Sequence, residues 1–292
     1  TQGTLDVLLR RDAANTLAQR NGVNAQTFNI YNTEDTSLTN YERAHIGWND
    51  TADTFVIGTE ALGTGVARGV HLKSGGDGLA WFDASTKDNV HIGLRASLQN
   101  TTYVGQTVVG VDALTSGQGQ YATVIGMDAG KTGRHDRSTF VGASIMSYST
   151  GTPNEGATMI GASAGFQLGI ASETVAVGYL AATGTGGWDG RLTNSVILGA
   201  RAGRNIYNGT TEVIGNIAIG HSSANTLTTG QNCIVIGTGA DVDSATADNQ
   251  LNIGGVIKGS MTSGSETLSL HGNVGIGTTT PGHVLDVVGS VN

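Results

Sequence analysis

The sequence predicts an all-β chain that folds as an elongated β-solenoid or β-roll, and three observations support this fold class. Glycine supplies 46 of the 292 residues, more than twice its usual share, whereas proline occurs only twice. Apolar residues make up 38% of the chain and charged residues only 13%, which fits neither a charge-rich helical bundle nor a disordered tail. In addition, one short motif that ends in glycine recurs every 16 to 23 residues.

Residues 1–88 precede the repeats and are expected to form an N-terminal β meander. Short runs rich in β-branched and aromatic residues alternate there with turns rich in Asn, Thr, Gly and Asp, which is typical of antiparallel strands. These runs are Thr27–Tyr31, Tyr41–Trp48, Asp53–Gly58 and Gly69–Lys73. We therefore predict that residues 1–88 form a first domain.

Residues 89–257 carry the repeat and are predicted to form the solenoid. In each copy an apolar residue or threonine, any residue, and then Ile, Val or Leu precede a glycine, and a small residue often follows three places later. The copies are Val90–Gly93, Thr107–Gly110, Thr123–Gly126, Thr139–Gly142, Thr158–Gly161, Val175–Gly178, Val196–Gly199, Ile217–Gly220, Ile234–Gly237, Leu251–Gly254 and, further on, Val274–Gly277. The spacing indicates one coil per copy, with a corner at each glycine, where stacked coils leave little room for a Cβ.

Alternation along a strand assigns a face to each position of the repeat. The first and third residues of each copy share a parity and are mostly apolar, so we expect their shared face to be the core. The residue between them varies, as in His91 and Asn252, and is expected to face solvent or a neighbouring layer. The same parity directs four threonines inward, which argues against an ice-binding ladder. They are Thr107, Thr123, Thr139 and Thr158.

The balance between burial and entropy predicts an oligomer. Each coil offers about two large apolar side chains, which offset little of the backbone entropy, about 1–2 kcal/mol per residue, that ordering a coil costs. Sharing faces with sister copies buries more surface and covers sheet edges, so we expect a homotrimer. Either each chain coils on itself, or three chains interleave as a triple β-helix. Residues 258–292 are predicted to form a third domain, a C-terminal β neck.

Charge and composition disfavour several classes of partner. Lys and Arg number 15 against 23 Asp and Glu, and the net charge of −8 disfavours nucleic acid. No stretch of 18 apolar residues and no basic-then-apolar leader occurs, so we expect no membrane insertion. Cys233 is the single cysteine, which rules out an intrachain disulfide, and its apolar neighbours are typical of a packed thiol.

No complete motif for a cofactor, a metal ion or a catalytic centre is present, and we expect none of the three. The run Gly126–Thr132 looks like a phosphate-binding loop, but it is one residue short and no convincing helix follows. Asp241, Asp243 and Asp248 lack the glycine and the distal glutamate of a calcium loop. The seven histidines show no paired metal-ligand spacing.

Three inserts lengthen the repeat and carry the candidate binding residues. They are Tyr148–Gly156, Gly184–Thr193 and Arg204–Thr211. An exposed aromatic ring flanked by Asp, Asn and Arg suits a sugar, because the apolar face of the sugar stacks on the ring while its hydroxyls meet the polar groups. The candidate receptor-binding residues are Tyr148, Trp188, Asp189, Arg191 and Tyr207. In the alternative interpretation, the aromatic rings fold back and fill space between coils.

The inserts and their surroundings also hold carboxylates that a glycan-cleaving enzyme would need. Glycoside hydrolysis requires two carboxyl groups facing one cleft. The candidates are Glu155, Glu173, Asp189 and Glu212. Isolated carboxylates on a solvated loop are the commoner case, so we expect no enzyme, and a polysaccharide-degrading tailspike is kept as an alternative.

Three parts of the chain resemble bacteriophage tail-fibre proteins. The segments Thr16–Gly22, Asn24–Phe28 and Asn40–Arg43 resemble the start of such proteins. The repeated Val-x-Ile-Gly-x-x-Ala coils are similar to the β-roll of trimeric autotransporter adhesin heads and of some phage fibre shafts. The run Asn273–Pro281, with Leu285–Val287 after it, resembles the stretch just upstream of an endosialidase-type intramolecular chaperone, which trimerises fibres and then cuts itself off.

The resemblance implies a virion structural protein of the phage tail, assembled in the host cytoplasm as a homotrimer. Its partners would be other tail or baseplate proteins and a polysaccharide of the host surface. The resemblance also implies that a chaperone is removed beyond Asn292 and that no protease activity is left. A purely structural shaft and a bacterial trimeric adhesin are the remaining alternatives.

Overall fold

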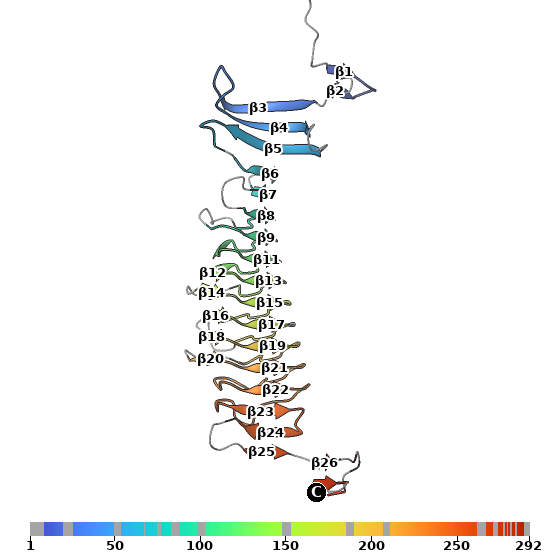
Figure 1. The fold of residues 1–292 in the computed structure, drawn as a ribbon, viewed down its shortest axis with the longest axis vertical. Helices are drawn as coiled ribbons and strands as arrows, with labels where there is room; N and C mark the ends of the chain where they lie inside the picture. Colours follow the sequence, from blue (N-terminus) through green and yellow to red (C-terminus); the bar gives the residue numbers. More distant parts are fainter. Residues whose placement is uncertain are drawn as a thin grey trace, which may run out of the picture. The chain divides into compact units, whose positions relative to one another are not determined.

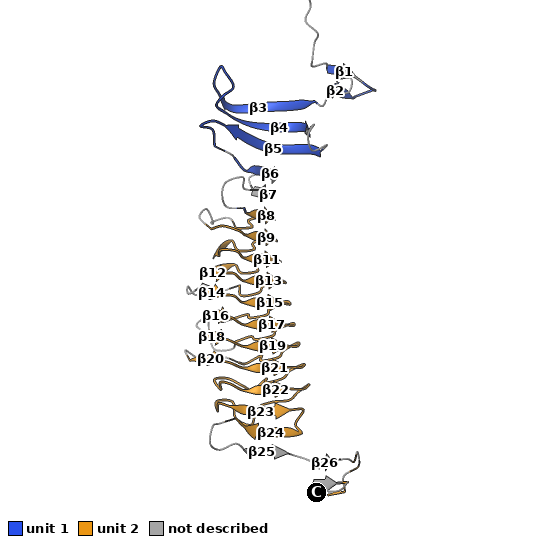
Figure 2. Ribbon diagram, in the orientation of Figure 1, with its two compact units in different colours: residues 1–72, 81–88 blue, residues 73–80, 89–292 orange. Residues whose placement is uncertain are grey.

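The computed structural model describes most of the chain and divides it into two compact units (Figures 1 and 2). The described residues are 9–19, 26–49, 54–66, 68–74, 77–82, 88–97, 103–147, 153–184, 190–206, 211–261, 267–270, 274–276, 278, 280, 282–283 and 285–288. Unit 1 comprises residues 1–72 and 81–88, and unit 2 comprises residues 73–80 and 89–292. Among the described residues every regular element is a β-strand, which confirms the all-β fold class.

Unit 1 contains the predicted N-terminal meander. Strands β3 (Thr27–Glu34), β4 (Tyr41–Asn49) and β5 (Thr54–Leu62) pair in sequence order as an antiparallel sheet, with a bulge between Tyr31 and Thr33. A separate antiparallel pair is formed by β1 (Leu9–Arg11) and β2 (Leu17–Gln19). The meander thus begins at the positions where β-branched and aromatic runs predicted strands.

The two faces of the meander differ in polarity. On one face Arg43 pairs with Glu60, and its guanidinium carbon lies 4.7 Å from the ring centroid of Tyr41 and 5.6 Å from that of Tyr31. The opposite face, here called the meander apolar face, exposes about half of each large side chain. Its members are Phe28, Ile30, Ile46, Trp48, Phe55 and Ile57.

A buried carboxylate ties the chain after β5 to β4. Glu42 is 6% exposed and accepts hydrogen bonds from the Arg68 guanidinium, the Val66 backbone N–H and the Asn32 amide. These donors lower the pKa of Glu42 to about 2, so the carboxylate is ionised at neutral pH. Glu42 therefore has a structural role.

Unit 2 is a solenoid of stacked parallel coils. The coil strands are β8 (Val90–Ile92), β9 (Thr107–Val109), β11 (Thr123–Ile125), β13 (Thr139–Val141), β15 (Thr158–Ile160), β17 (Val175–Val177), β19 (Val196–Leu198), β21 (Ile217–Ile219), β22 (Ile234–Ile236) and β23 (Gln250–Ile253). Each pairs in parallel with the strand of the next coil of the same chain, as the stack in Figure 1 shows. The chain therefore coils on itself, and the solenoid prediction is confirmed.

Shorter strands complete the coils and follow the last one. Two further parallel sheets consist of β10 (Ser116–Gln118), β12 (Thr132–Asp136) and β14 (Pro153–Glu155), and of β16 (Leu168–Ser172), β18 (Gly190–Thr193) and β20 (Glu212–Ile214). In the main sheet β24 (Ile257–Ser260) and β25 (Thr267–Leu270) continue antiparallel after β23, and β7 (Asp77–Phe82) and β6 (Val70–Ser74) follow β8. Beyond them β26 (Val274–Ile276) pairs with β27 (Leu285–Val287).

The assignment of faces within the repeat was wrong. The middle residue of every coil strand is buried, and these residues are His91, Val108, Val124, Phe140, Met159, Ala176, Ile197, Ala218, Val235 and Asn252. The first and third residues remain partly or largely exposed; Ile92 and Ile160, for example, are each 40% exposed. The interior of a coil is narrow, so one side chain per strand fills it, and its size varies with what the opposite wall leaves free.

The direction of the threonines is corrected by the same observation. Thr107, Thr123, Thr139 and Thr158 occupy first positions in register with one another and point away from the coil interior. Side-chain direction therefore does not argue against an ice-binding face. The column changes composition at Val175, which follows Thr158 in register, and it is aliphatic from there on.

The glycine after each coil strand is required by its backbone and by its neighbour. Gly126 has φ of +135°, and a Cβ on it would collide with the backbone oxygen of Gly142 in the next coil. The same relation runs from Gly93 to Gly220, so these glycines form a continuous column, which we call the glycine column. Small residues three places later are buried, as Ala113 and Ala129 are, which confirms the predicted small inward position.

A second corner, which the sequence analysis missed, lies two residues before each copy of the repeat from Val90–Gly93 to Leu251–Gly254. We call it the left-handed corner, because φ there is between +49° and +72° in every coil. Its residues are Asp88, Gly105, Tyr121, Arg137, Gly156, Glu173, Asn194, Gly215, Asn232 and Asn249. Glycine and asparagine adopt this conformation readily, whereas Tyr121, Arg137 and Glu173 adopt it at a cost of about 1–2 kcal/mol each.

Candidate functional site

The three inserts open from neighbouring coils on one side of the solenoid. Strand β14 belongs to the first insert, β18 to the second, and β20 follows the third. In β18, Arg191 pairs in register with Glu212 of β20, so the second and third inserts belong to adjacent coils. The coil of β16 links them to the first insert, because the Ala171 backbone N–H donates to Asn154 Oδ1 of β14 and β16 pairs with β18. Inserts separated in sequence are thus brought to one edge.

Of the five candidate receptor-binding residues, the structure describes one. Arg191 lies in β18 and is exposed, between Ile170 of the preceding coil and Glu212 of the following coil. The other four, Tyr148, Trp188, Asp189 and Tyr207, lie outside the described residues. The structure therefore describes strands β14, β18 and β20, which lie in or directly after the three inserts, but only one of the five candidate side chains.

The candidate carboxylates make separate contacts. Glu155 pairs with Arg137, and Glu212 Oε1 accepts a hydrogen bond of 3.1 Å from the Thr193 hydroxyl. Glu173 is exposed at a left-handed corner. Asp189 lies outside the described residues. Among the three described carboxylates, Glu155, Glu173 and Glu212, no two share a side-chain partner.

The segment that looks like a phosphate-binding loop is a coil corner. Lys131 Nζ lies 2.8 Å from Asp128 Oδ1, and Thr132 begins strand β12. The backbone therefore offers no helix N-terminus to a phosphate.

The three aspartates near the end of the solenoid bind parts of the chain itself. Asp241 accepts hydrogen bonds from the Thr226 backbone N–H, and Asp248 accepts one from Gln231. Asp243 pairs with Lys258 at 2.5 Å. Within the described ranges no group of three or more His, Cys, Asp or Glu side chains is arranged to hold a metal ion.

Two buried groups with reactive chemistry serve the interior of the solenoid. His135 is fully buried, and its Nε2 donates to the Thr132 carbonyl at 2.8 Å, so Nδ1 accepts from the Asn154 amide at 2.9 Å. Burial lowers the pKa of His135 to about 4, and the ring is neutral. Cys233 is buried as well, and burial raises the pKa of its thiol, which disfavours the reactive thiolate.

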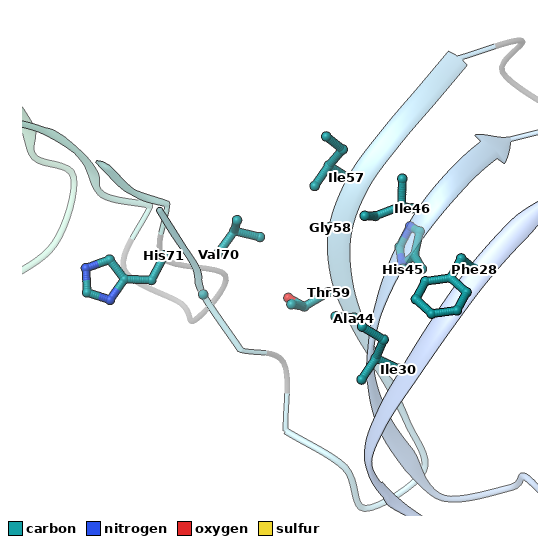
Figure 3. A pocket seen from close by; sticks show the side chains of 11 residues that line it. Phe28, Ile30, Ala44, His45, Ile46, Ile57, Gly58, Thr59, Val70 and His71 are labelled. Atoms are coloured by element: carbon teal, nitrogen blue, oxygen red, sulfur yellow. The ribbon is translucent and has the colours of Figure 1, made fainter. Parts of the chain in front are cut away.

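Unit 1 carries an apolar groove of about 260 Å³ beside its meander (Figure 3). Phe28, Ile30, Ile46 and Ile57 of the meander apolar face line it, together with Gly69–His71. In Figure 3, Val70 lies on the side of the groove opposite the sheet. The lining is mostly hydrocarbon, so the groove suits an apolar side chain better than a polar ligand.

Two surfaces were not recognised as candidate sites in the sequence. The first and third residues of the coil strands, here called the outer face, are Val, Ile, Leu or Thr in all ten coils and carry no charge. Tyr121 is 60% exposed at a left-handed corner. The sequence could have indicated the surface at Tyr121, because the equivalent position one coil earlier is Gly105. Glycine at that position leaves room for the large ring of Tyr121 in the next coil.

Comparison with protein-family models, with curated proteins and with solved structures found no match. The part of the chain that the structure describes has no helix long and apolar enough to span a membrane. The functional argument therefore rests on the residues and their geometry.

Proposed function

We propose that the chain is a homotrimeric fibre protein of a bacteriophage tail, which attaches the virion to a glycan on the host cell surface without enzymatic turnover. The observation that carries this proposal is the outer face. It runs along ten coils, which at about 4.8 Å per coil is about 43 Å, and it consists only of aliphatic residues and threonine.

An uncharged, largely apolar face of this length is stabilised when another apolar surface covers it. Contiguous apolar surface on a soluble protein marks an interaction site. A second copy of the chain offers the same face, with the same coil spacing and no charge to desolvate. Cyclic association of parallel copies closes the interface, and the number three comes from the resemblance to trimeric fibre and adhesin rolls.

The meander apolar face supports the same conclusion independently. A sheet that is hydrophobic on one face buries that face against another layer of structure. Phe28, Trp48 and Phe55 are each more than half exposed within one chain. Sister copies supply that second layer in the proposed trimer.

Attachment is assigned to the side of the solenoid where the inserts open. The described ends of the three inserts lie beside strands β14, β18 and β20 there, whereas the outer face is covered by sister copies in the proposed trimer. The receptor-binding residues proposed are Tyr148, Trp188, Asp189, Arg191 and Tyr207, each present three times, so weak single sites add through avidity. From the resemblance we further propose a virion-tail location, assembly in the host cytoplasm, and contacts with other tail or baseplate proteins.

Mass measurement and cell adsorption test the proposal together. Native mass is expected to be three times the denatured mass. The labelled protein is expected to adsorb to bacterial strains that carry the receptor glycan, and to lose adsorption after periodate oxidation of their surface. Trp188→Ala is expected to weaken adsorption while leaving the trimer intact.

Specific results contradict each part. A native mass equal to that of a single chain would contradict the proposed homotrimeric fibre. Adsorption that persists after periodate oxidation of the cell surface would contradict a glycan receptor. Shortening of the polysaccharide by the purified protein overturns attachment without turnover and favours the tailspike alternative.

A further inference from the structure

Tyr121 lies against the backbone of the preceding coil. Its backbone N–H donates to the Val104 carbonyl at 2.9 Å, which fixes its place in the stack. A Cβ on Gly105, which holds the left-handed corner one coil earlier, would lie 2.7 Å from Tyr121 Cδ1 and 3.2 Å from Cε1. The ring therefore covers the glycine, and the side chain is still 60% exposed. This arrangement presents an aromatic surface to solvent.

Polar residues of its own coil and of the neighbouring coils lie next to Tyr121 in the backbone register of the stack. The Tyr103 hydroxyl donates to Gln118 Oε1 at 2.5 Å, and Gln118 pairs in register with Arg134 of the next coil. The Gln120 backbone N–H, next to Tyr121, donates to Asp136 Oδ1 at 3.0 Å. We call this surface the tyrosine patch, and its members are Tyr103, Gln118, Tyr121, Arg134, Asp136, Arg137 and Glu155.

The charges of the tyrosine patch balance. Arg134 Nη2 lies 2.7 Å from Asp136 Oδ2, and Arg137 pairs with Glu155. Both guanidinium groups keep substantial exposure, with the side chains 42% and 65% accessible. The patch thus offers hydrogen-bond donors and acceptors without net charge.

We propose that the tyrosine patch binds a neutral glycan chain built of hexoses. A hexose has an apolar ring face that stacks on an exposed aromatic ring and hydroxyls that suit paired Arg, Asp and Gln side chains. The inference rests on the proposed attachment function and adds a site outside its five candidate residues. The three copies in a fibre present three patches.

The same observations disfavour polyanionic ligands. Single-stranded nucleic acid also stacks on aromatic rings, but it needs unpaired cationic groups along its backbone. Here both arginines already have carboxylate partners, and the whole chain carries a net charge of −8. A sulfated or phosphate-rich polymer would face the same two carboxylates.

Affinity electrophoresis of the full chain in native gels tests the proposal. The probes are dextran, mannan, galactan and, as the polyanion, dextran sulfate. The wild-type protein is expected to be retarded by at least one neutral polymer. Tyr121→Ala is expected to weaken that binding about tenfold, whereas Tyr121→Phe, which keeps the ring, is expected to bind as the wild type does.

Controls separate binding from folding. Asn232→Ala alters an exposed residue at the same left-handed corner, with φ of +54° against +56° for Tyr121, and is expected to leave binding of the neutral polymer unchanged. Circular dichroism and native mass confirm the fold of each variant. Tyr103→Ala provides a second test of the patch should Tyr121→Ala not fold.

Three outcomes would contradict the proposal that the tyrosine patch binds a neutral glycan. They are no retardation by any neutral polymer, equal retardation of the wild type and Tyr121→Ala, and retardation by dextran sulfate alone. Continued periodate-sensitive adsorption to cells in any of these cases leaves the proposed function standing and removes only this site. Loss of both adsorption and trimer removes the function itself.

Discussion

Individual residues determine how tightly coils stack, and the glycine column is the clearest case. Its members have φ between +125° and +143°, a conformation that side chains rarely adopt, and each faces the backbone of the next coil. Some glycines outside this column are under less constraint. Gly239, for example, has φ of +67° and nothing within 4 Å of where a Cβ would lie.

Gly126→Ala is expected to destabilise the fold by more than about 2 kcal/mol, because backbone strain adds to the collision with Gly142. Gly239→Ala is the matched control and is expected to cost about 1 kcal/mol, since only the left-handed backbone is strained. Denaturant unfolding of both variants measures the difference. Equal losses would show that coil contact at the glycine column contributes nothing.

His135 makes stability depend on pH. The unfolded imidazole takes up a proton near pH 6.5, whereas in the folded chain the pKa is about 4. Between these values the unfolded state binds more protons, so stability is complete above pH 6.5 and falls by up to about 3 kcal/mol towards pH 4. Over this pH interval the free energy of unfolding is expected to change more steeply with pH for the wild type than for His135→Gln. Parallel pH profiles would contradict the assignment.

At the scale of the elements, each coil strand separates two environments by alternation. The middle side chain fills the coil, and its two neighbours form the outer face. Ala218 is fully buried between Ile217 and Ile219, which are both partly exposed. The solenoid therefore places its most uniform apolar columns outside.

The threonine part of the outer face gives a prediction for these elements. In the proposed trimer Thr123 and Thr139 are covered by sister copies. Thr123→Val and Thr139→Val are therefore expected to stabilise the trimer by about 1 kcal/mol per site and chain, because the buried hydroxyl is replaced by a methyl group. Thermal unfolding measures this. Unchanged or lower stability would indicate that the threonines face water.

The sequence was sufficient for the strands and the glycine column, because their period and residue types recur in every coil. It was not sufficient for the direction of the faces. Hydrophobicity favoured the first and third positions as core, yet the middle position accepts His91 and Met159 alike, since the narrow interior demands fit and not a residue type. The left-handed corner stayed hidden because Asp88, Tyr121 and Gly156 share a backbone conformation and no chemistry.

At the scale of the whole molecule, each of the two units exposes an apolar surface of its own. The outer face belongs to unit 2, and the meander apolar face belongs to unit 1. In the proposed trimer, sister copies cover each of these two surfaces. The inserts, in contrast, open from another side of the coils, where Arg191 and Glu212 pair in register.

Ile219→Asp is expected to dissociate the trimer while the coils persist, because the new charge lies on the outer face. Ala218→Asp, one residue earlier, is expected to unfold its coil, since it buries the charge within the chain. Native mass and circular dichroism distinguish the two results. A trimeric Ile219→Asp protein would exclude this face as the interface.

The glycine column and the inserts together make the solenoid a natural scaffold for displaying foreign peptides. Stacking is set at corners where a single methyl group is too much, whereas the repeats that contain residues 184–193 and 204–211 are longer than the shortest ones. Peptides grafted at these two positions would start from adjacent coils, because β18 and β20 pair in register. A library of grafted sequences would then vary what is recognised while the stacked coils stay the same.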